Sequence, residues 1–361
     1  MSIFQKARTF AVRYERHLSV LSMVGGFILD NLALERADLP FETYLLYSYL
    51  ALSGVFILAI HVAEEGVWKG KLAAYSRPWL PIALQFISGS MFSAFLVFYS
   101  RSASLLSSWP FLAVLFAVFA GTEIFKRYQD RLAFQSAIFF FGIFSFAIYA
   151  VPLWMGRIGA DVFLLSGAAA LAAFGMFFAL LFATGPRRLK IATKKTIASV
   201  LGVLVVVNVF YFTHLLPPLP LALRDIGVYH SVTKMGGGYA VAGEAESWVS
   251  AFLGKSDVRI LPGEPVYVFS SVFTPITVKT DIVHRWERFD TIQNRWVLNS
   301  IIAFPAVGGR DGGYRGYSEV GSIPPGLWRV SVETPDGRLI GRVGFTVTYV
   351  SAEPPLFESV L

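Results

Sequence analysis

The sequence predicts a membrane-embedded bundle of about seven α-helices followed by a C-terminal all-β sandwich of the immunoglobulin-like type. Two observations support this prediction. Seven long apolar runs fill residues 1–216, and a hydrocarbon layer about 30 Å thick takes roughly 20 apolar residues of helix to cross. After Pro217 these runs stop, and apolar residues alternate with polar ones as in half-buried β-strands. We therefore expect an integral membrane protein with a globular domain on one side of the bilayer.

Composition supports this class. The chain has 361 residues, of which 55% are hydrophobic and 15% charged, and its mean hydropathy of +0.58 exceeds that of soluble proteins of this length. Its net charge of +7 comes from residues 1–216, because residues 217–361 hold 13 Lys or Arg against 14 Asp or Glu. A nucleic-acid-binding domain is thereby disfavoured. With no cysteine in the chain, disulfides, thiolate nucleophiles and sulfur metal ligands are excluded.

The charged loops predict the orientation of the helices. We place the spans near Leu18 to Ala33, Phe41 to Ala63, Trp79 to Tyr99, Ala103 to Phe125, Leu132 to Met155, Val162 to Thr184 and Ile197 to Leu216. The N-terminus and the alternate loops on its side carry 15 Lys or Arg, whereas the opposite loops carry only Arg36, Arg101 and Arg157. Positive charge stays on the cytoplasmic side. The N-terminus is therefore expected inside and the C-terminal domain outside.

The first apolar segment is the weakest of the seven. Asp30 interrupts it, and a charge at mid-bilayer would cost several kcal/mol, so this residue should lie near the outer interface. A cleaved signal peptide is the alternative, but no small-x-small cleavage site precedes Glu35. Asp30, Asn31 and Asp38 form a polar cluster at the outer end of the first two spans. A solvated turn explains this cluster most simply.

Other polar residues in the spans are candidates for chemistry, since such residues are functional suspects by default. The amides of Gln85, Gln135 and Asn208 are expected either to make interhelical hydrogen bonds or to lie near the membrane interface. His61 with Glu64 and Glu65 has a spacing that could serve a metal, but a single such unit favours interface solvation. The phenylalanines at 139–141 are interpreted as lipid-facing. No metal site, cofactor or catalytic residue is predicted, and neither repeats nor paired broken helices indicate a transporter.

The remaining chain divides into a proline-rich linker at residues 217–225, a β domain at residues 226–348 and a tail at residues 349–361. Residues 226–264 are ambiguous, with a short helix possible around Glu244 to Leu253. The predicted strands are Val266 to Phe273, Ile276 to Phe289, Arg295 to Phe304, Tyr314 to Val320, Leu327 to Glu333 and Leu339 to Val347. The sequence Thr334-Pro-Asp-Gly predicts a turn that joins the last two strands into an antiparallel hairpin.

Short motifs in this domain carry a resemblance. They are His284-Arg-Trp286, Arg315-Gly-Tyr317-Ser318, Gly326-Leu-Trp328-Arg329-Val330 and Asp336-Gly337. Their order and spacing over about residues 265–347 resemble a bacterial family of extracytoplasmic β domains of unknown function. The stretch from Gly26 to Leu34 is similar to the membrane part of seven-helix members. The resemblance implies architecture and a place in the cell envelope, and it supplies no catalytic residue.

Candidate ligand-binding residues concentrate in the segment from Gly308 to Ser318. Glycines let a backbone approach a ligand, arginine offers a bidentate fork and tyrosine offers a stacking face, which suits a sugar, a peptide or an acidic group. A connecting hairpin loop is the simpler alternative. His284, within a predicted strand beside Trp286, is expected to be a structural hydrogen-bonding residue. The candidate residues are Arg310, Tyr314, Arg315, Tyr317, Ser318 and His284.

Together these observations predict a multi-pass protein of the bacterial cytoplasmic membrane that displays a binding or interaction module outside. Besides the bilayer, its partner could be an envelope glycan, a peptide or another membrane protein. An enzyme acting on lipid or envelope glycan, with its centre at Asp30 to Glu42, is one alternative, although a non-enzyme is favoured. The other alternative is a transporter or channel subunit.

Overall fold

The computed structural model describes two compact units, one built mainly from residues 1–216 and one mainly from residues 217–361. The described residues are 27–28, 30, 32, 34, 40–69, 77, 79–102, 105–124, 132–236, 238–244, 255–275, 278–307 and 313–361. Most of the first predicted span lies outside them, as do Asn31, Asp38, Arg310 and most of the possible helix around Glu244 to Leu253.

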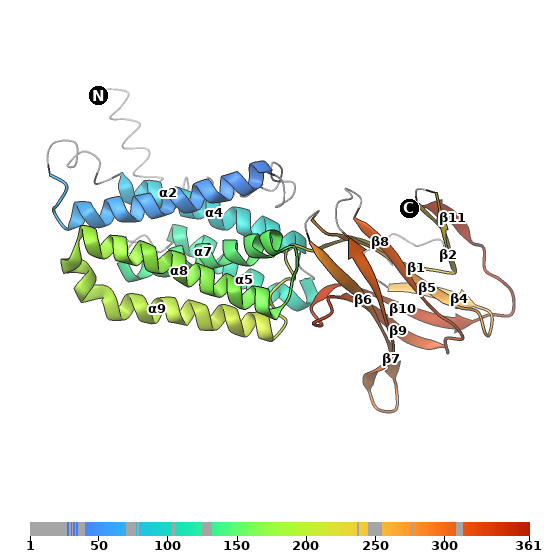
Figure 1. Ribbon diagram of the computed structural model, residues 1–361. Coiled ribbons are helices and arrows are strands. Elements are labelled where there is room, and N and C mark those ends of the chain that lie inside the picture. Colours follow the sequence, from blue (N-terminus) through green and yellow to red (C-terminus); the bar gives the residue numbers. More distant parts are fainter. Residues whose placement is uncertain are drawn as a thin grey trace, which may run out of the picture. The chain divides into compact units, whose positions relative to one another are not determined.

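The first unit is helical (Figure 1). Among the described residues its helices are α2 (Pro40–Glu64), α4 (Leu80–Ser102), α5 (Leu105–Ile124), α7 (Leu132–Met155), α8 (Ala160–Thr184) and α9 (Pro186–Phe212). Five of these helices are long and apolar enough to cross a membrane, and α5 holds a shorter apolar stretch at Ser108–Gly121. The protein is therefore a membrane protein by the length and composition of its helices. Six of the seven predicted spans have a helix in the described chain, and the count of seven is not confirmed.

Two features of this unit differ from the prediction. The helix α9 begins at Pro186 rather than near Ile197, so the basic segment before the span is helical. Lys and Arg are good helix formers, and Pro186 at the first helical position fits its fixed backbone angle. The prediction that residues 139–141 face lipid is wrong. Phe140 is fully buried and contacts Phe144 and Phe174, because α7 is the most buried of the five long helices.

The described residues of the second unit form three β-sheets. One has five strands in the order β4 (Lys255–Ile260), β10 (Leu339–Tyr349), β9 (Gly326–Glu333), β6 (Lys279–Asp290) and β7 (Arg295–Val307). A second has the order β1 (Ala222–Tyr229), β5 (Val266–Phe273) and β8 (Tyr314–Val320). The third has the order β11 (Phe357–Val360), β3 (Gly238–Gly243) and β2 (Ser231–Met235).

The first two sheets share one hydrophobic core. Trp286, Trp328 and Phe345 of the five-stranded sheet belong to the same buried cluster as Val228 and Val268 of the three-stranded sheet. Both tryptophans are almost fully buried, and the ring of Trp286 meets that of Phe345 edge to face. The alternation of side chains along each strand therefore sends one set into this core and leaves the other set on the outer faces.

The small third sheet packs on the outer side of the sheet β1-β5-β8. Val232 of β2 and Val241 of β3 form a second buried cluster with Phe269 of β5, whose side chain alternates with the core residues Val268 and Ser270. The C-terminal strand β11 completes this sheet by pairing with β3. The sheets thus extend past the predicted boundaries of the β domain at both ends, to Ala222 and to Val360.

All six predicted strands are present, and those at Val266–Phe273 and Tyr314–Val320 have the predicted bounds. The hairpin of β9 and β10 is antiparallel as predicted, and its turn is closed by a hydrogen bond from Thr334 N to Arg338 O of 2.9 Å. Gly337 has a φ of 82°, a conformation that glycine adopts at little cost.

Candidate functional site on the outer face of the five-stranded sheet

Most described residues of the predicted loop site make contacts with other residues of the β domain. Arg310 lies outside the described residues. The ring of Tyr314 stacks on Phe304 at 6.4 Å and packs against the core. The Arg315 guanidinium donates a hydrogen bond to the carbonyl of Leu361 (3.0 Å), so it fastens the C-terminal strand. These contacts favour a structural role for Tyr314 and Arg315.

His284 and Ser318 lie together in the core. The imidazole Nδ1 is 2.7 Å from Ser318 Oγ, and Nε2 is 2.8 Å from Ser270 Oγ. The Trp286 indole N–H also donates to Ser318 Oγ, at 2.9 Å. Burial lowers the pKa of His284 to about 3, so the ring is neutral at physiological pH. A fully buried ring held from both nitrogens acts as a structural hydrogen-bonding group and is not open to a ligand.

Tyr317 is the one described loop candidate with a substantially exposed side chain, at 38%. Its ring lies 6.0 Å from that of Tyr239 and 6.1 Å from that of Tyr267. Burial, followed by the negative charge of Glu319, raises the pKa of the Tyr267 phenol. The three rings form a small platform. The sequence prediction missed Tyr239 and Tyr267 because their strands, β3 and β5, are far from the loop along the sequence.

The polar candidate residues of the membrane unit make contacts with neighbouring helices. Ser93 of α4 donates a hydrogen bond to the Asp30 carboxylate. His61 is fully buried, and its Nε2 lies 3.0 Å from Leu181 O and 2.9 Å from Gly185 O, so it caps the end of α8. No group of His, Cys, Asp or Glu in the described part of the chain has an arrangement that could hold a metal ion.

The outer face of the five-stranded sheet gathers a different set of side chains. In the register of the sheet, Arg342, Ser331, Arg285 and Ile301 form one cross-strand row over β10, β9, β6 and β7. Gly344, Arg329, Glu287 and Leu298 form the next row. Because Trp286 and Val330 between these rows point into the core, both rows point away from it. We refer to these two rows with Trp296, Leu327 and Glu333 as the outer face.

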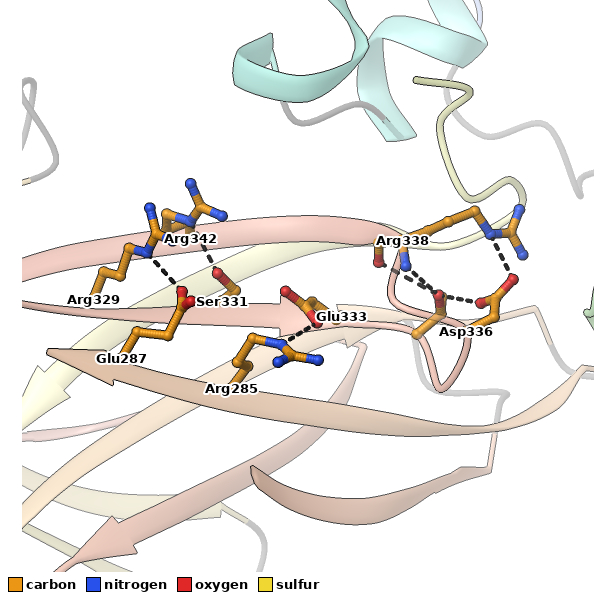
Figure 2. A network of polar contacts seen from close by, with 9 residues as sticks. Arg285, Glu287, Arg329, Ser331, Glu333, Asp336, Arg338 and Arg342 are labelled. Atoms are coloured by element: carbon orange, nitrogen blue, oxygen red, sulfur yellow. Dashed lines mark hydrogen bonds and ion pairs between the residues drawn. The ribbon is translucent and has the colours of Figure 1, made fainter. Parts of the chain in front are cut away.

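Ion pairs link the strands across the outer face (Figure 2). Arg329 Nε lies 2.6 Å from Glu287 Oε2, and Arg285 Nε lies 3.0 Å from Glu333 Oε2. Arg342 Nε instead donates to Ser331 Oγ, at 2.9 Å. Burial, followed by the positive charge of Arg329, lowers the pKa of Arg342, which remains a cation at neutral pH. With three arginines and two glutamates, the face is positively charged.

Apolar side chains flank these ion pairs. Leu298, Ile301 and Leu327 are 47%, 52% and 49% exposed. The guanidinium of Arg329 stacks over the Trp296 ring at 4.3 Å from its centroid, in cation–π geometry. Trp and Arg are enriched at the centres of protein–protein interfaces, where they are buried together with apolar surface. Within the described part of the β domain no strand covers Leu298, Ile301 and Leu327, since they remain about half accessible.

The comparisons with known proteins concern mainly the β domain. Residues 279–347 match the model of a family described as "Protein of unknown function (DUF2914)". The match includes most strands of the five-stranded sheet. It agrees with the resemblance to a family of unknown function, and it leaves the short motifs untested. No curated protein is similar enough to the chain to count as a match.

Two solved structures show weak likenesses to the chain. The β-glucosidase from Listeria innocua in complex with glucose is 15% identical over 35% of this chain and 16% of that one, with a TM-score of 0.20. The Pseudomonas fluorescens alkylpurine DNA glycosylase AlkC bound to DNA with an abasic site analog is 9% identical over 87% of this chain and 99% of that one, with a TM-score of 0.23. This chain thus spans under a fifth of the β-glucosidase. At such scores neither likeness bears on fold or function.

Proposed function

We propose that this protein is a membrane-anchored interaction module of the bacterial cell envelope. A bundle of about seven helices, with its N-terminus in the cytoplasm, would hold an immunoglobulin-like β-sandwich on the outer side of the cytoplasmic membrane. The outer face of the five-stranded sheet would bind another envelope protein. The observation that carries this proposal is the concentration of exposed Leu298, Ile301 and Leu327 around the stacked Arg329 and Trp296.

The chemistry of the outer face favours a protein as the partner. A sheet surface with aliphatic side chains suits a broad complementary surface better than a sugar, whose sites present aromatic platforms and hydrogen-bonding groups. The excess of arginine favours a partner that carries carboxylates beside apolar groups. The ion pairs hold Arg285 and Arg329 extended over the sheet, which reduces the side-chain ordering that binding would require.

Site-specific photocrosslinking in intact cells tests this proposal. A benzophenone amino acid replaces Leu298 or Ile301 in the full chain, and matched exposed positions at Lys234 and Tyr317 serve as controls. We expect a discrete protein adduct from the two outer-face positions only, which an Arg329→Glu exchange abolishes without lowering the amount of protein in the membrane. Adducts of equal yield at Lys234 would contradict a specific face. Crosslinks confined to Tyr317 would instead assign recognition to the tyrosine platform.

A further inference from the structure

Two glutamines from different helices line the same cavity in the membrane unit. The cavity lies among α2, α4 and α7, and Ser53, Gln85, Ser88 and Gln135 contribute its polar lining. Gln135 is 6% exposed and Ser53 is 1% exposed, so both are withdrawn from lipid. In the sequence these amides are isolated residues of separate spans, whereas the fold brings Gln85 and Gln135 to one cavity.

The buried hydroxyl of Ser53 is the main evidence for a bound molecule in the cavity. Its Oγ is buried, and no protein atom in the described part of the chain hydrogen-bonds to it. A buried hydroxyl without a partner costs about 1–3 kcal/mol, so such groups are usually satisfied by a bound molecule when protein does not satisfy them. The cavity therefore combines a hydrogen-bonding group in need of a partner with two amides, each of which can both donate and accept.

Size and charge define the class of molecule that fits. The cavity offers about 20 Å³ to the centre of a water molecule, and about 10–15 Å³ suffices for one water. None of its lining residues in the described chain is charged, so a bare ion would lose its hydration without compensation. The ligand is therefore neutral, polar and no larger than one or two water molecules.

The helices also define how deep the cavity lies. Ser53 lies eleven residues before the end of α2, which at 1.5 Å per residue is about 17 Å from that end. Gln85 lies five residues after the start of α4, which is about 8 Å from that start. By the charge of the loops, both ends face the cytoplasm. We infer that α2, α4 and α7 bind water, or a neutral hydrogen-bonding molecule of its size, at Ser53, Gln85 and Gln135 in the cytoplasmic half of the bundle.

Radiolytic hydroxyl-radical labelling of the full chain in nanodiscs tests this inference, because a bound water generates radicals where it is held. Met91 and Phe139 line the cavity, whereas Phe140, the neighbour of Phe139 on α7, is fully buried and does not. After correction for intrinsic reactivity, we expect Met91 and Phe139 to be oxidised several-fold faster than Phe140. Ser53→Ala and Gln135→Leu should each remove most of this excess.

Phe140 also reports on folding, since it gains label in any variant that opens the bundle. If Gln135→Leu opens the bundle, the conservative Ser53→Ala variant provides the test of the bound water. Oxidation of Met91 and Phe139 at the rate of Phe140 in the parent would overturn the inference. So would an excess that persists unchanged in both variants while Phe140 stays protected.

Discussion

Ser318 is the residue whose removal tests the buried polar network most sharply. Its hydroxyl contacts two groups that have no access to water, the Trp286 N–H at 2.9 Å and His284 Nδ1 at 2.7 Å. In Ser318→Ala both groups lose this partner, and each buried unsatisfied group costs about 1–3 kcal/mol. We therefore expect the free energy of unfolding to fall by about 2–6 kcal/mol. Ser270→Ala affects only His284 Nε2, so its cost should be about half as large.

Urea unfolding of the β unit, residues 217–361, measures both variants. A double-mutant cycle adds a second check, because Trp286→Phe removes the indole N–H that Ser318→Ala leaves without a partner. In the Ser318→Ala background, Trp286→Phe should therefore cost clearly less than in the parent. Equal losses for Ser318→Ala and Ser270→Ala, or full additivity in the cycle, would refute the network.

The remaining predictions also concern the β unit. The pKa of His284 is about 3 in the folded state against 6.5 in the unfolded chain, so between these values the unfolded chain binds one more proton. The free energy of unfolding should therefore be complete above about pH 6.5 and fall between pH 6.5 and 3. At pH 5 the loss should be about 2 kcal/mol. Urea midpoints measured across this range test the slope, which His284→Gln should flatten. Trp328→Ala should cost about 3–5 kcal/mol, because its indole is 1% exposed in the shared core, and a loss below 1 kcal/mol would refute that placement. Residues 217–361 expressed alone should be soluble with a β-type circular dichroism spectrum. They should also melt at a higher temperature than residues 226–348, which lack part of β1 and all of β11. Equal melting temperatures would show that these strands add no stability.

The sequence predicted most of the five-stranded sheet because its strands alternate clearly and its last turn has distinctive residues. The third sheet escaped prediction for a physical reason. The strand Gly238–Gly243 is rich in glycine and alanine, and its partner Phe357–Val360 is four residues long and lies more than a hundred residues away. Such pairing depends on tertiary contacts rather than on local pattern.

Sequence patterns alone do not show which residues share the outer face. Leu298 and Ile301 resemble core residues in a strand pattern, and an irregularity of register between Trp286 and Glu287 decides which β7 residues share their face. The loop prediction rested on residue types alone. His284 and Ser318 belong to the core because strand register places their side chains there, which composition does not reveal.

Thiol labelling in intact cells most directly tests the proposal that the β domain is displayed on the outer side of a membrane whose inner side faces the basic loops. Because the chain has no cysteine, Ser351→Cys in the β unit and Lys194→Cys in the basic part of α9 each give one exposed reactive site. An impermeant maleimide should label Ser351→Cys in intact cells and should label Lys194→Cys only after the cells are opened. Labelling of Lys194→Cys in intact cells, with protection of Ser351→Cys, would contradict the account.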